Sequence, residues 1–249
     1  MKSAALRAQV EASLGFPFTY RQDYTPETAP WGVPSMDALT GGLPRGGLVE
    51  IVGPASSGRT SLLHLILAQA TAREECCALI DLQDAFEPRF AEMAGINLKR
   101  LLWIRCYGLE PALKVADLVL QSGGFGVAAL DMSGITPKFA RRVPLSFWFR
   151  LRRAIEYTST VLVLLEQEAS AASCASLALR TESHYICWPA PAIKTGPSEA
   201  RTRNKDRMSP HACLLSGVHF RASVLRSRMQ RPRHGPDAAC FELGTLWEP

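Results

Sequence analysis

The chain has 249 residues, of which 47% are hydrophobic and 20% are charged, and its formal net charge at pH 7 is +5. These values are ordinary for a soluble globular protein with one main domain and a sizeable buried core. Polar residues break every apolar stretch well before the roughly 20 residues that a membrane-spanning helix requires, and the amino terminus lacks the uninterrupted apolar run of a secretory signal. We therefore expect a cytoplasmic protein without membrane contact.

The first 32 residues (1–32) are expected to form an arm rather than a domain. Residues 3–14 have the character of a short helix, and a linker that contains proline and aromatic residues follows them. Such an arm could dock on a neighbouring molecule or pack on its own core, and the sequence leaves both alternatives open.

Strands and helices alternate regularly over residues 33–190. The expected strands cover 47–53, 76–82, 101–106, 125–131 and 160–167. The helices between them are expected at 59–73, 87–95, 110–123 and 145–158. The inward face of the last helix is expected to consist of Phe147, Leu151, Ala154 and Ile155. Strands joined by helical crossovers form a mostly parallel sheet with helices on both faces, so the predicted fold class is α/β.

Residues 191–249 are expected to form a basic extension that is partly disordered. Between positions 194 and 235 there are ten lysine or arginine residues and only two acidic ones. Such a run favours contact with nucleic acid or with an acidic partner, but a solvated tail explains it equally well. Apolar residues return at 212–220 and 240–247, where edge strands of the sheet could form.

The seven cysteines show no spacing that is typical of a metal site. None of them falls in a CxxC pair, and Cys76 and Cys77 begin an apolar strand. We therefore interpret the cysteines as core residues of a protein in a reducing compartment, and we expect neither zinc nor disulfide bonds.

The segment GPASSGRTS has the form of a phosphate-binding loop between a strand and a helix, with arginine where that motif has lysine. Its glycines let successive backbone N–H groups point at phosphate oxygens, and the helix that follows adds the positive end of its dipole. Thr60 would bring a hydroxyl to Mg²⁺, and Asp131, at the end of an apolar strand, is placed to reach the same ion. The expected nucleotide-binding residues of the loop are Gly53, Ser56, Ser57, Gly58, Arg59, Thr60 and Ser61.

Four longer blocks occur in the order and spacing of one known family. They are GGLPRGGLVEIVGPASSGRTS, ALIDLQDAFEP, SGGFGVAALDMSGITP and LLEQ. In these blocks, over residues 33–188, the chain resembles the ATPase core of the RecA recombinases. The resemblance implies a RecA-like P-loop core that binds ATP and Mg²⁺. It also implies that Phe90 stacks on adenine, that Asp131 is the Walker B acid and that Gln167 senses the γ-phosphate.

Two departures from the family pattern bear on hydrolysis. Gln83 stands where the family has the glutamate that activates the attacking water, and an amide cannot accept a proton at neutral pH. Arg59 carries a longer planar fork than lysine and cannot occupy the same point between the β- and γ-phosphates. We therefore expect no ATPase activity or a very weak one. A displaced acid at Asp84, Glu87 or Glu166 is the alternative that would restore activity.

Positive charge marks two candidate surfaces for single-stranded DNA or for a protein partner. One lies on the loop and helix that follow the Walker B strand, and the other lies in the carboxyl-terminal extension. The candidate residues are Arg141, Arg142, Arg150, Arg153, Arg203 and Lys205. The resemblance also implies that the run 203–205 reaches the nucleotide of a neighbouring subunit in a homo-oligomer. The family's DNA-gripping loops are short in this chain, so strand exchange is not expected.

Five shorter segments point to a narrower group. They are LPRG, SSGRTSLL, RLLWIRC, LQSGGFG and FWFRLRRAIE. In them the chain is similar to the ImuA-type RecA-like proteins of bacterial mutasomes. This resemblance implies a damage-induced (SOS) DNA-repair scaffold for error-prone translesion synthesis, with an inactive Y-family-like polymerase homologue, an error-prone DNA polymerase and RecA as partners. The alternative is an active DNA-dependent ATPase or recombinase that binds single-stranded DNA.

Overall fold

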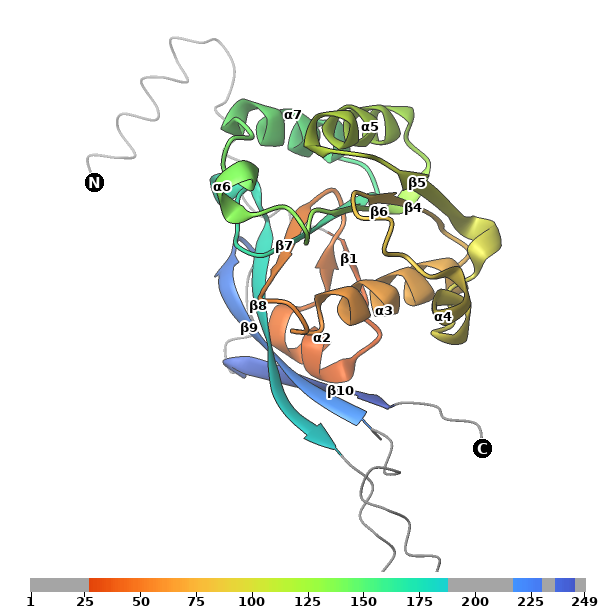
Figure 1. Ribbon diagram of the computed structural model, residues 1–249, viewed down its shortest axis with the longest axis vertical. Coiled ribbons are helices and arrows are strands. Elements are labelled where there is room, and N and C mark those ends of the chain that lie inside the picture. The colour runs from red at the N-terminus through yellow and green to blue at the C-terminus, as the bar shows by residue number, and fades with distance from the viewer. Residues whose placement is uncertain (1–26, 188–216, 230–235, 245–249) are drawn as a thin grey trace, which may run out of the picture.

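The computed structural model describes residues 27–187, 217–229 and 236–244 (Figure 1). The expected helix 3–14 lies outside the described residues, as do Arg203 and Lys205 of the expected basic extension. Among the described residues, no helix combines the length and the apolar character that crossing a bilayer requires.

An eight-stranded sheet forms the centre of the described fold (Figure 1). From one edge to the other its strands are β10 (Ala238–Gly244), β9 (Gly217–Ser227), β8 (Leu177–Cys187), β3 (Leu48–Val52), β7 (Val161–Glu166), β6 (Phe125–Asp131), β4 (Cys76–Asp81) and β5 (Leu101–Arg105). The six strands from β8 to β5 are parallel, whereas β9 and β10 join the sheet antiparallel. A separate two-stranded ladder joins β1 (Thr28–Ala29) and β2 (Leu43–Pro44). The predicted α/β fold with a mostly parallel sheet is therefore confirmed.

Helices cover both faces of this sheet, because each parallel connection must cross over it. One face carries α2 (Pro34–Thr40), α3 (Arg59–Ala72) and α4 (Pro88–Met93). The opposite face carries α5 (Leu109–Ser122) and α7 (Leu145–Ile155). Short helical turns occupy three connections, namely η1 (Leu98–Arg100), α6 (Pro137–Ala140) and η2 (Ala172–Cys174). Two hydrophobic clusters result, one on each side of the sheet.

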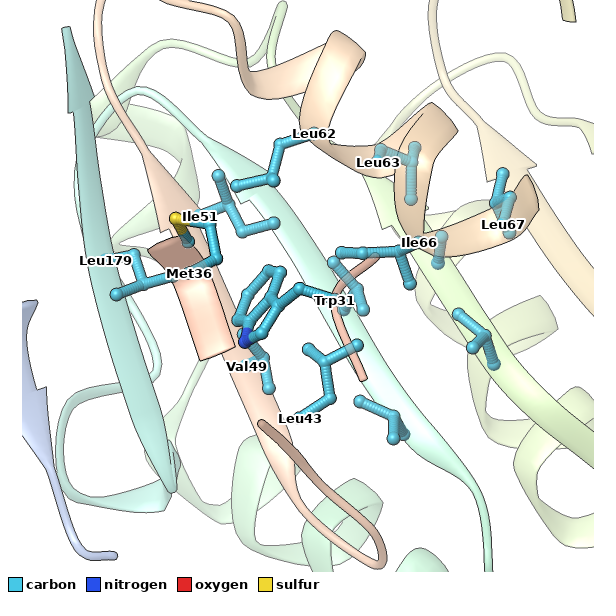
Figure 2. Close-up of a cluster of buried hydrophobic side chains, with 14 of the residues drawn as sticks. Trp31, Met36, Leu43, Val49, Ile51, Leu62, Leu63, Ile66, Leu67 and Leu179 are labelled. Atoms are coloured by element: carbon cyan, nitrogen blue, oxygen red, sulfur yellow. The ribbon is translucent and has the colours of Figure 1, made fainter. Parts of the chain in front are cut away.

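The cluster beneath α3 is drawn in Figure 2. The helix buries Leu62, Ile66, Leu67 and Ala70, and Leu63 is buried beside them. Apolar side chains at intervals of three and four residues lie on one side of an α-helix, so this face meets the sheet along the whole length of α3.

Trp31 lies in the same cluster, although the sequence analysis places it at the end of the arm. Figure 2 shows its ring beside Leu43 and Val49. The side chain is fully buried, and its Nε1 donates a hydrogen bond of 2.8 Å to Thr40 Oγ1, so the indole N–H has a partner inside the core. Residues 27–32 thus pack as part of the central fold.

The inward face of α7 contains the expected residues but has a different centre. It is centred on Trp148, which is fully buried, together with Leu151 and Ile155, whereas Phe147 and Ala154 are only partly buried. The indole is the largest side chain of this helix and covers more of the sheet than a phenyl ring. The helix is therefore rotated so that Trp148 faces inward and the ring of Phe147 meets its edge at 5.7 Å between centroids.

The strands after the basic segment belong to the central sheet. β9 begins inside the apolar stretch 212–220 but continues through Ser227, so it includes Arg221 and Arg226 of the expected basic extension. Arg226 donates from Nη2 to Glu50 Oε2 at 3.3 Å, and Glu50 has no exposed surface. Part of the basic run is thus ordered by pairing and by an ion pair with a buried acid of β3.

Replacing Trp148 by alanine should destabilise the fold strongly. The change leaves a large cavity on a fully buried face, and such cavities cost about 3–5 kcal/mol. Phe149→Ala is the matched control, since the neighbouring ring is 47% exposed and should cost less than about 1 kcal/mol. Urea unfolding followed by circular dichroism measures both values. Equal losses in the two variants would contradict the observed orientation of α7.

Candidate nucleotide site at the carboxyl ends of the parallel strands

The loop GPASSGRTS lies at the carboxyl end of β3, the edge at which parallel α/β sheets bind their ligands. Ser56 and Gly58 have positive φ angles of 58° and 85°, which turn the backbone tightly before α3. Gly58 is the N-cap of that helix, so the first N–H groups of α3 lack carbonyl partners within the helix and face the loop. Thr60 is exposed and Ser61 is half-buried on this first turn.

Strands β8 and β9 support the loop from one side. The Oγ of Ser57 lies 3.0 Å from Oγ1 of Thr181 on β8. A Cβ on Gly53 would approach the Thr181 carbonyl to 2.4 Å, and a Cβ on Gly58 would approach the ring of Phe220 on β9 to 2.7 Å. Close packing therefore favours glycine at both positions, and the positive φ of Gly58 favours it there a second time. A cavity of about 270 Å³ opens beside the loop, lined by residues 56–61 and by Ser183, Ile186, Val218 and Phe220.

The guanidinium of Arg59 turns into the protein. The side chain is only 7% exposed, and its Nη1 donates to the backbone carbonyl of Glu166 at the end of β7, at 2.5 Å. The same carbonyl accepts from the N–H of Gly53 at 3.3 Å. Burial lowers the pKa of Arg59, while the negative charge of Asp131 acts in the opposite direction. Arg59 thus joins the first turn of α3 to β7 through a buried, charge-assisted hydrogen bond.

Two buried carboxylates lie side by side at the ends of adjacent strands. Asp131 of β6 is paired in register with Asp81 of β4, and they are 8% and 2% exposed. Asp81 accepts from the N–H groups of Gln83 and Phe86 at 2.9 and 3.0 Å. Burial raises the pKa of Asp131, an effect opposed by hydrogen bonds from Ser133 and strengthened by the charge of Asp81. A divalent cation at this edge would offset both the cost of burying the charged carboxylates and the repulsion between them.

Two glutamines converge on Ser133, which follows β6. Gln83 donates from Nε2 to Ser133 Oγ at 2.9 Å, and Gln167 donates from Nε2 to the Ser133 carbonyl at 3.2 Å. Both glutamines thus lie near Asp131, whose Oδ1 accepts from the N–H of Ser133 at 2.9 Å. The structure brings together Arg59, Asp131, Gln83 and Gln167, four positions that lie far apart along the chain.

The expected acids near the site occupy three different places. Asp84 pairs with Arg105 at 3.7 Å, and Glu87 caps α4 by accepting from the N–H of Arg89. Glu166 lies two positions after Leu164 on β7, so both side chains project from the same face of the sheet. Leu164 belongs to the hydrophobic cluster beneath α5 and α7, so Glu166 points to that face and away from α3. Burial raises the pKa of Glu166 to about 8, and the charge of Glu50 adds to this effect.

Phe90 lies on α4 with 67% of its side chain exposed, so its ring is free to stack on a planar ligand. It is placed on the same face of the sheet as α3. The expectation that it contacts adenine stays a prediction.

The basic residues after β6 form an exposed surface on α6 and α7. Arg141 pairs with Glu168, and Arg150 donates to Asp117 Oδ1 at 3.2 Å. The guanidinium of Arg142 lies over the ring of Phe139 at 4.7 Å, and Arg153 is exposed. The surface therefore combines arginines, two of which are paired with acids, with exposed aromatic rings.

Three residues of the site were not predicted from the sequence. Asp81 ends a strand in the same way as Asp131 and could have been found by that signal. Ser133 has no local signal, because it gains its role only when two distant glutamines reach it. Phe220 lies 162 positions after Gly58, and no local pattern links an aromatic residue of a late strand to the loop.

The raised pKa of Glu166 gives the stability a pH dependence of definite sign. The folded protein keeps this proton up to about pH 8, while the unfolded chain releases it near pH 4.3, so the wild type loses stability as the pH rises through this window. Glu166→Gln stays neutral and should lose about 3 kcal/mol less between pH 5 and pH 8. Urea unfolding across this range measures the difference. Glu92→Gln, an exposed change on α4, is the control, and parallel curves for all three proteins would refute the interpretation.

Comparison with known proteins gives an independent view of this architecture. Residues 21–140 match the family model of the RecA N-terminal domain. Protein RecA of Methylococcus capsulatus is 43% identical over 99 residues, which are 39% of this chain and 28% of the relative. Protein RecA of Rickettsia bellii is 33% identical over 142 residues, or 54% of this chain and 41% of the relative. Protein RecA of Brucella anthropi is 37% identical over 115 residues, or 45% and 32%.

The matched segments thus span between about a quarter and two fifths of the length of these relatives. The family-model match contains the phosphate loop, Asp81, Gln83 and Asp131, which are parts of the described fold that build the site. The matches and the observed sheet together support a RecA-like family for this chain.

Proposed function

We propose that this chain is a RecA-like accessory of DNA repair that binds ATP with Mg²⁺ and turns it over very slowly, if at all. The buried hydrogen bond of Arg59 to the Glu166 carbonyl carries this proposal. The guanidinium of Arg59 holds α3 against β7 through this bond, so it does not point toward the position of a γ-phosphate.

The residues around the loop suit a nucleotide. The curled backbone of residues 53–58 and the start of α3 offer N–H groups to phosphate oxygens. Thr60 is exposed on the first turn, and the buried carboxylate of Asp131 lies near Arg59. These two side chains would hold Mg²⁺, which supplies charge neutralisation between the phosphates when it is bound. Gly53, Ser56, Ser57, Gly58 and Ser61 would complete the cradle.

The same site is poorly equipped for hydrolysis. The Gln83 amide donates to Ser133 and has no basic group for a water proton, and loss of a general base removes about 10²–10⁴ in rate. Asp84, Glu87 and Glu166 are each engaged elsewhere or face the opposite side of the sheet. Gln167 donates to the Ser133 carbonyl. It would still contact a bound γ-phosphate and would transmit nucleotide binding to the surrounding loops.

The finer assignment follows from the ImuA-type segments. A chain that holds ATP without rapid turnover suits a scaffold role in translesion synthesis, in which an inactive polymerase homologue, an error-prone polymerase and RecA would be its partners. Phe139 and Phe149 are exposed, Arg142 lies over the ring of Phe139, and Arg153 is exposed on the same helix as Phe149. These groups offer a surface for single-stranded DNA, because aromatic rings stack on bases and guanidinium groups contact phosphates.

Restoring the two family residues tests the proposal directly. Arg59→Lys with Gln83→Glu returns a compact cation and a proton acceptor to the site, and ATP turnover should rise at least ~10²-fold over the wild type. The measurement is phosphate release from purified protein with and without single-stranded DNA. Asp131→Ala in the same background should abolish the gain, which excludes a contaminating ATPase.

The wild type should bind ATP with Mg²⁺ in equilibrium titrations while releasing little phosphate. Rapid hydrolysis by the wild type, stimulated by single-stranded DNA and lost in Asp131→Ala, would instead establish the active DNA-dependent ATPase.

The basic surface makes a separate prediction. Removing Arg142 and Arg153 together should weaken binding of a single-stranded oligonucleotide and lower the slope of log affinity against log salt by about 0.7 for each phosphate group that the variant no longer neutralises. Arg89→Ala with Lys99→Ala removes the same charge from exposed positions on α4 and η1 and serves as the control. Fluorescence anisotropy at several salt concentrations gives both quantities. Equal slopes for the two double variants would show that this surface does not contact DNA.

A further inference from the structure

Three side chains that are typical metal ligands meet on the outer strands of the sheet, far along the chain from the phosphate loop. Cys187 ends β8, His219 lies near the start of β9 and Glu242 lies in β10. Their ligand atoms all lie within 4.8 Å of one another. His219 Nε2 and Glu242 Oε1 are 3.4 Å apart. Within the described ranges, no other group of this kind was found.

The register of the three strands explains the convergence. Glu242 is paired with His219, and Cys187 is paired with Gly217, two positions before His219. Residues two positions apart on a strand project from the same face, so all three side chains lie on one side of the sheet. Gly217 has no side chain, and a Cβ there would stand 3.2 Å from Glu242 Oε1. The glycine therefore leaves the space between the thiol and the carboxylate open.

The imidazole of His219 is held in place by stacking. The ring of Tyr185 lies 4.0 Å from it, centroid to centroid, with 17° between the planes. The stack restricts rotation of the ring, and Nε2 faces the Glu242 carboxylate. Orientation of a ligating histidine by its surroundings is a common feature of protein metal sites.

We propose that Cys187, His219 and Glu242 form a binding site for one divalent transition-metal ion, with Zn²⁺ as the best match. Sulfur, imidazole nitrogen and carboxylate oxygen are the three donors that zinc takes in proteins. Bond lengths of about 2.0–2.2 Å to nitrogen and oxygen give a tetrahedral edge of about 3.4 Å, which is the separation already present between His219 and Glu242. The thiol lies within 4.8 Å of the other two ligand atoms, so it has to move closer by at most about 1 Å.

Three protein ligands leave the fourth tetrahedral position open. The side chain of Glu242 is 56% exposed, so water reaches this position. The site would therefore bind a water molecule or an exogenous ligand in addition to the protein groups, unlike a closed structural zinc site with four protein ligands.

The proposed metal site lies behind one wall of the cavity beside the phosphate loop. Val218 and Phe220 alternate with His219 along β9, so they project to the opposite face, where they line the cavity beside the phosphate loop. A metal ion would cross-link β8, β9 and β10 on the back of that wall. This assignment depends on the strand geometry alone and stands independently of the proposed ATP site.

Alkylation of the full chain tests the assignment without any substitution. Protein kept reduced, freed of metal with a chelator and desalted, is treated with iodoacetamide with and without one equivalent of ZnCl₂, and each cysteine is followed by mass spectrometry. Metal binding blocks a thiolate, so Zn²⁺ should slow the alkylation of Cys187 at least ~10-fold. Cys240, an exposed thiol two positions before Glu242 on the same strand, should keep its rate. An unchanged rate at Cys187 would overturn the proposal.

Variants then identify the ligands. Cys187→Ser, His219→Gln and Glu242→Gln should each weaken Zn²⁺ binding at least ~10-fold in competition with a chromophoric chelator, and Cys240→Ser should bind like the wild type. Co²⁺ provides a spectroscopic check, since its thiolate charge-transfer band should appear in Cys240→Ser and be absent from Cys187→Ser. If Cys187→Ser binds Zn²⁺ as tightly as Cys240→Ser, the cluster is an ordinary histidine–glutamate ion pair.

Discussion

The hydrogen bond from the buried guanidinium of Arg59 to the Glu166 carbonyl is the interaction on which the geometry of this site depends. The guanidinium joins the first turn of α3 to the last carbonyl of β7 and lies close enough to Asp131 for their charges to interact. One side chain thus fixes the relative positions of three elements that meet beneath the phosphate loop. A lysine could not make the same contact with its single ammonium while also reaching phosphate.

The two faces of the sheet divide the ionisable groups in a consistent way. The face under α3 holds Asp81 and Asp131, which lie in register at the carboxyl ends of β4 and β6. The opposite face holds Glu50 and Glu166, which lie under α5 and α7 and are both fully buried or nearly so. Backbone N–H groups of Ser170 and Ala171 and the side chain of Arg226 stabilise Glu50. Strand alternation thus places the two aspartates and the two glutamates on opposite faces of the sheet.

The sequence predicted well those features that depend on neighbouring residues. The alternation of strands and helices, the loop from Gly53 and the acid at the end of β6 all follow from local periodicity and local turn chemistry. The expected face of α7 was confirmed at Leu151 and Ile155 but lacked Trp148, because periodicity ignores the sizes of the side chains, which decide which residue lies at the centre of the buried face. The meeting of Cys187, His219 and Glu242 was not foreseeable either. Their spacing along the chain has no pattern, and only the register of three antiparallel strands brings them together.

The contact between Gly58 and the ring of Phe220 has a consequence for the unit that can act as a nucleotide-binding module. The match to the RecA N-terminal domain model ends at residue 140, yet the aromatic ring that packs against its loop belongs to β9, nearly eighty residues later. The loop and its support therefore belong to one cooperative body. A shortened chain that stops before β9 would keep the sequence of the phosphate loop. It would lack the Phe220 ring against which Gly58 of that loop packs.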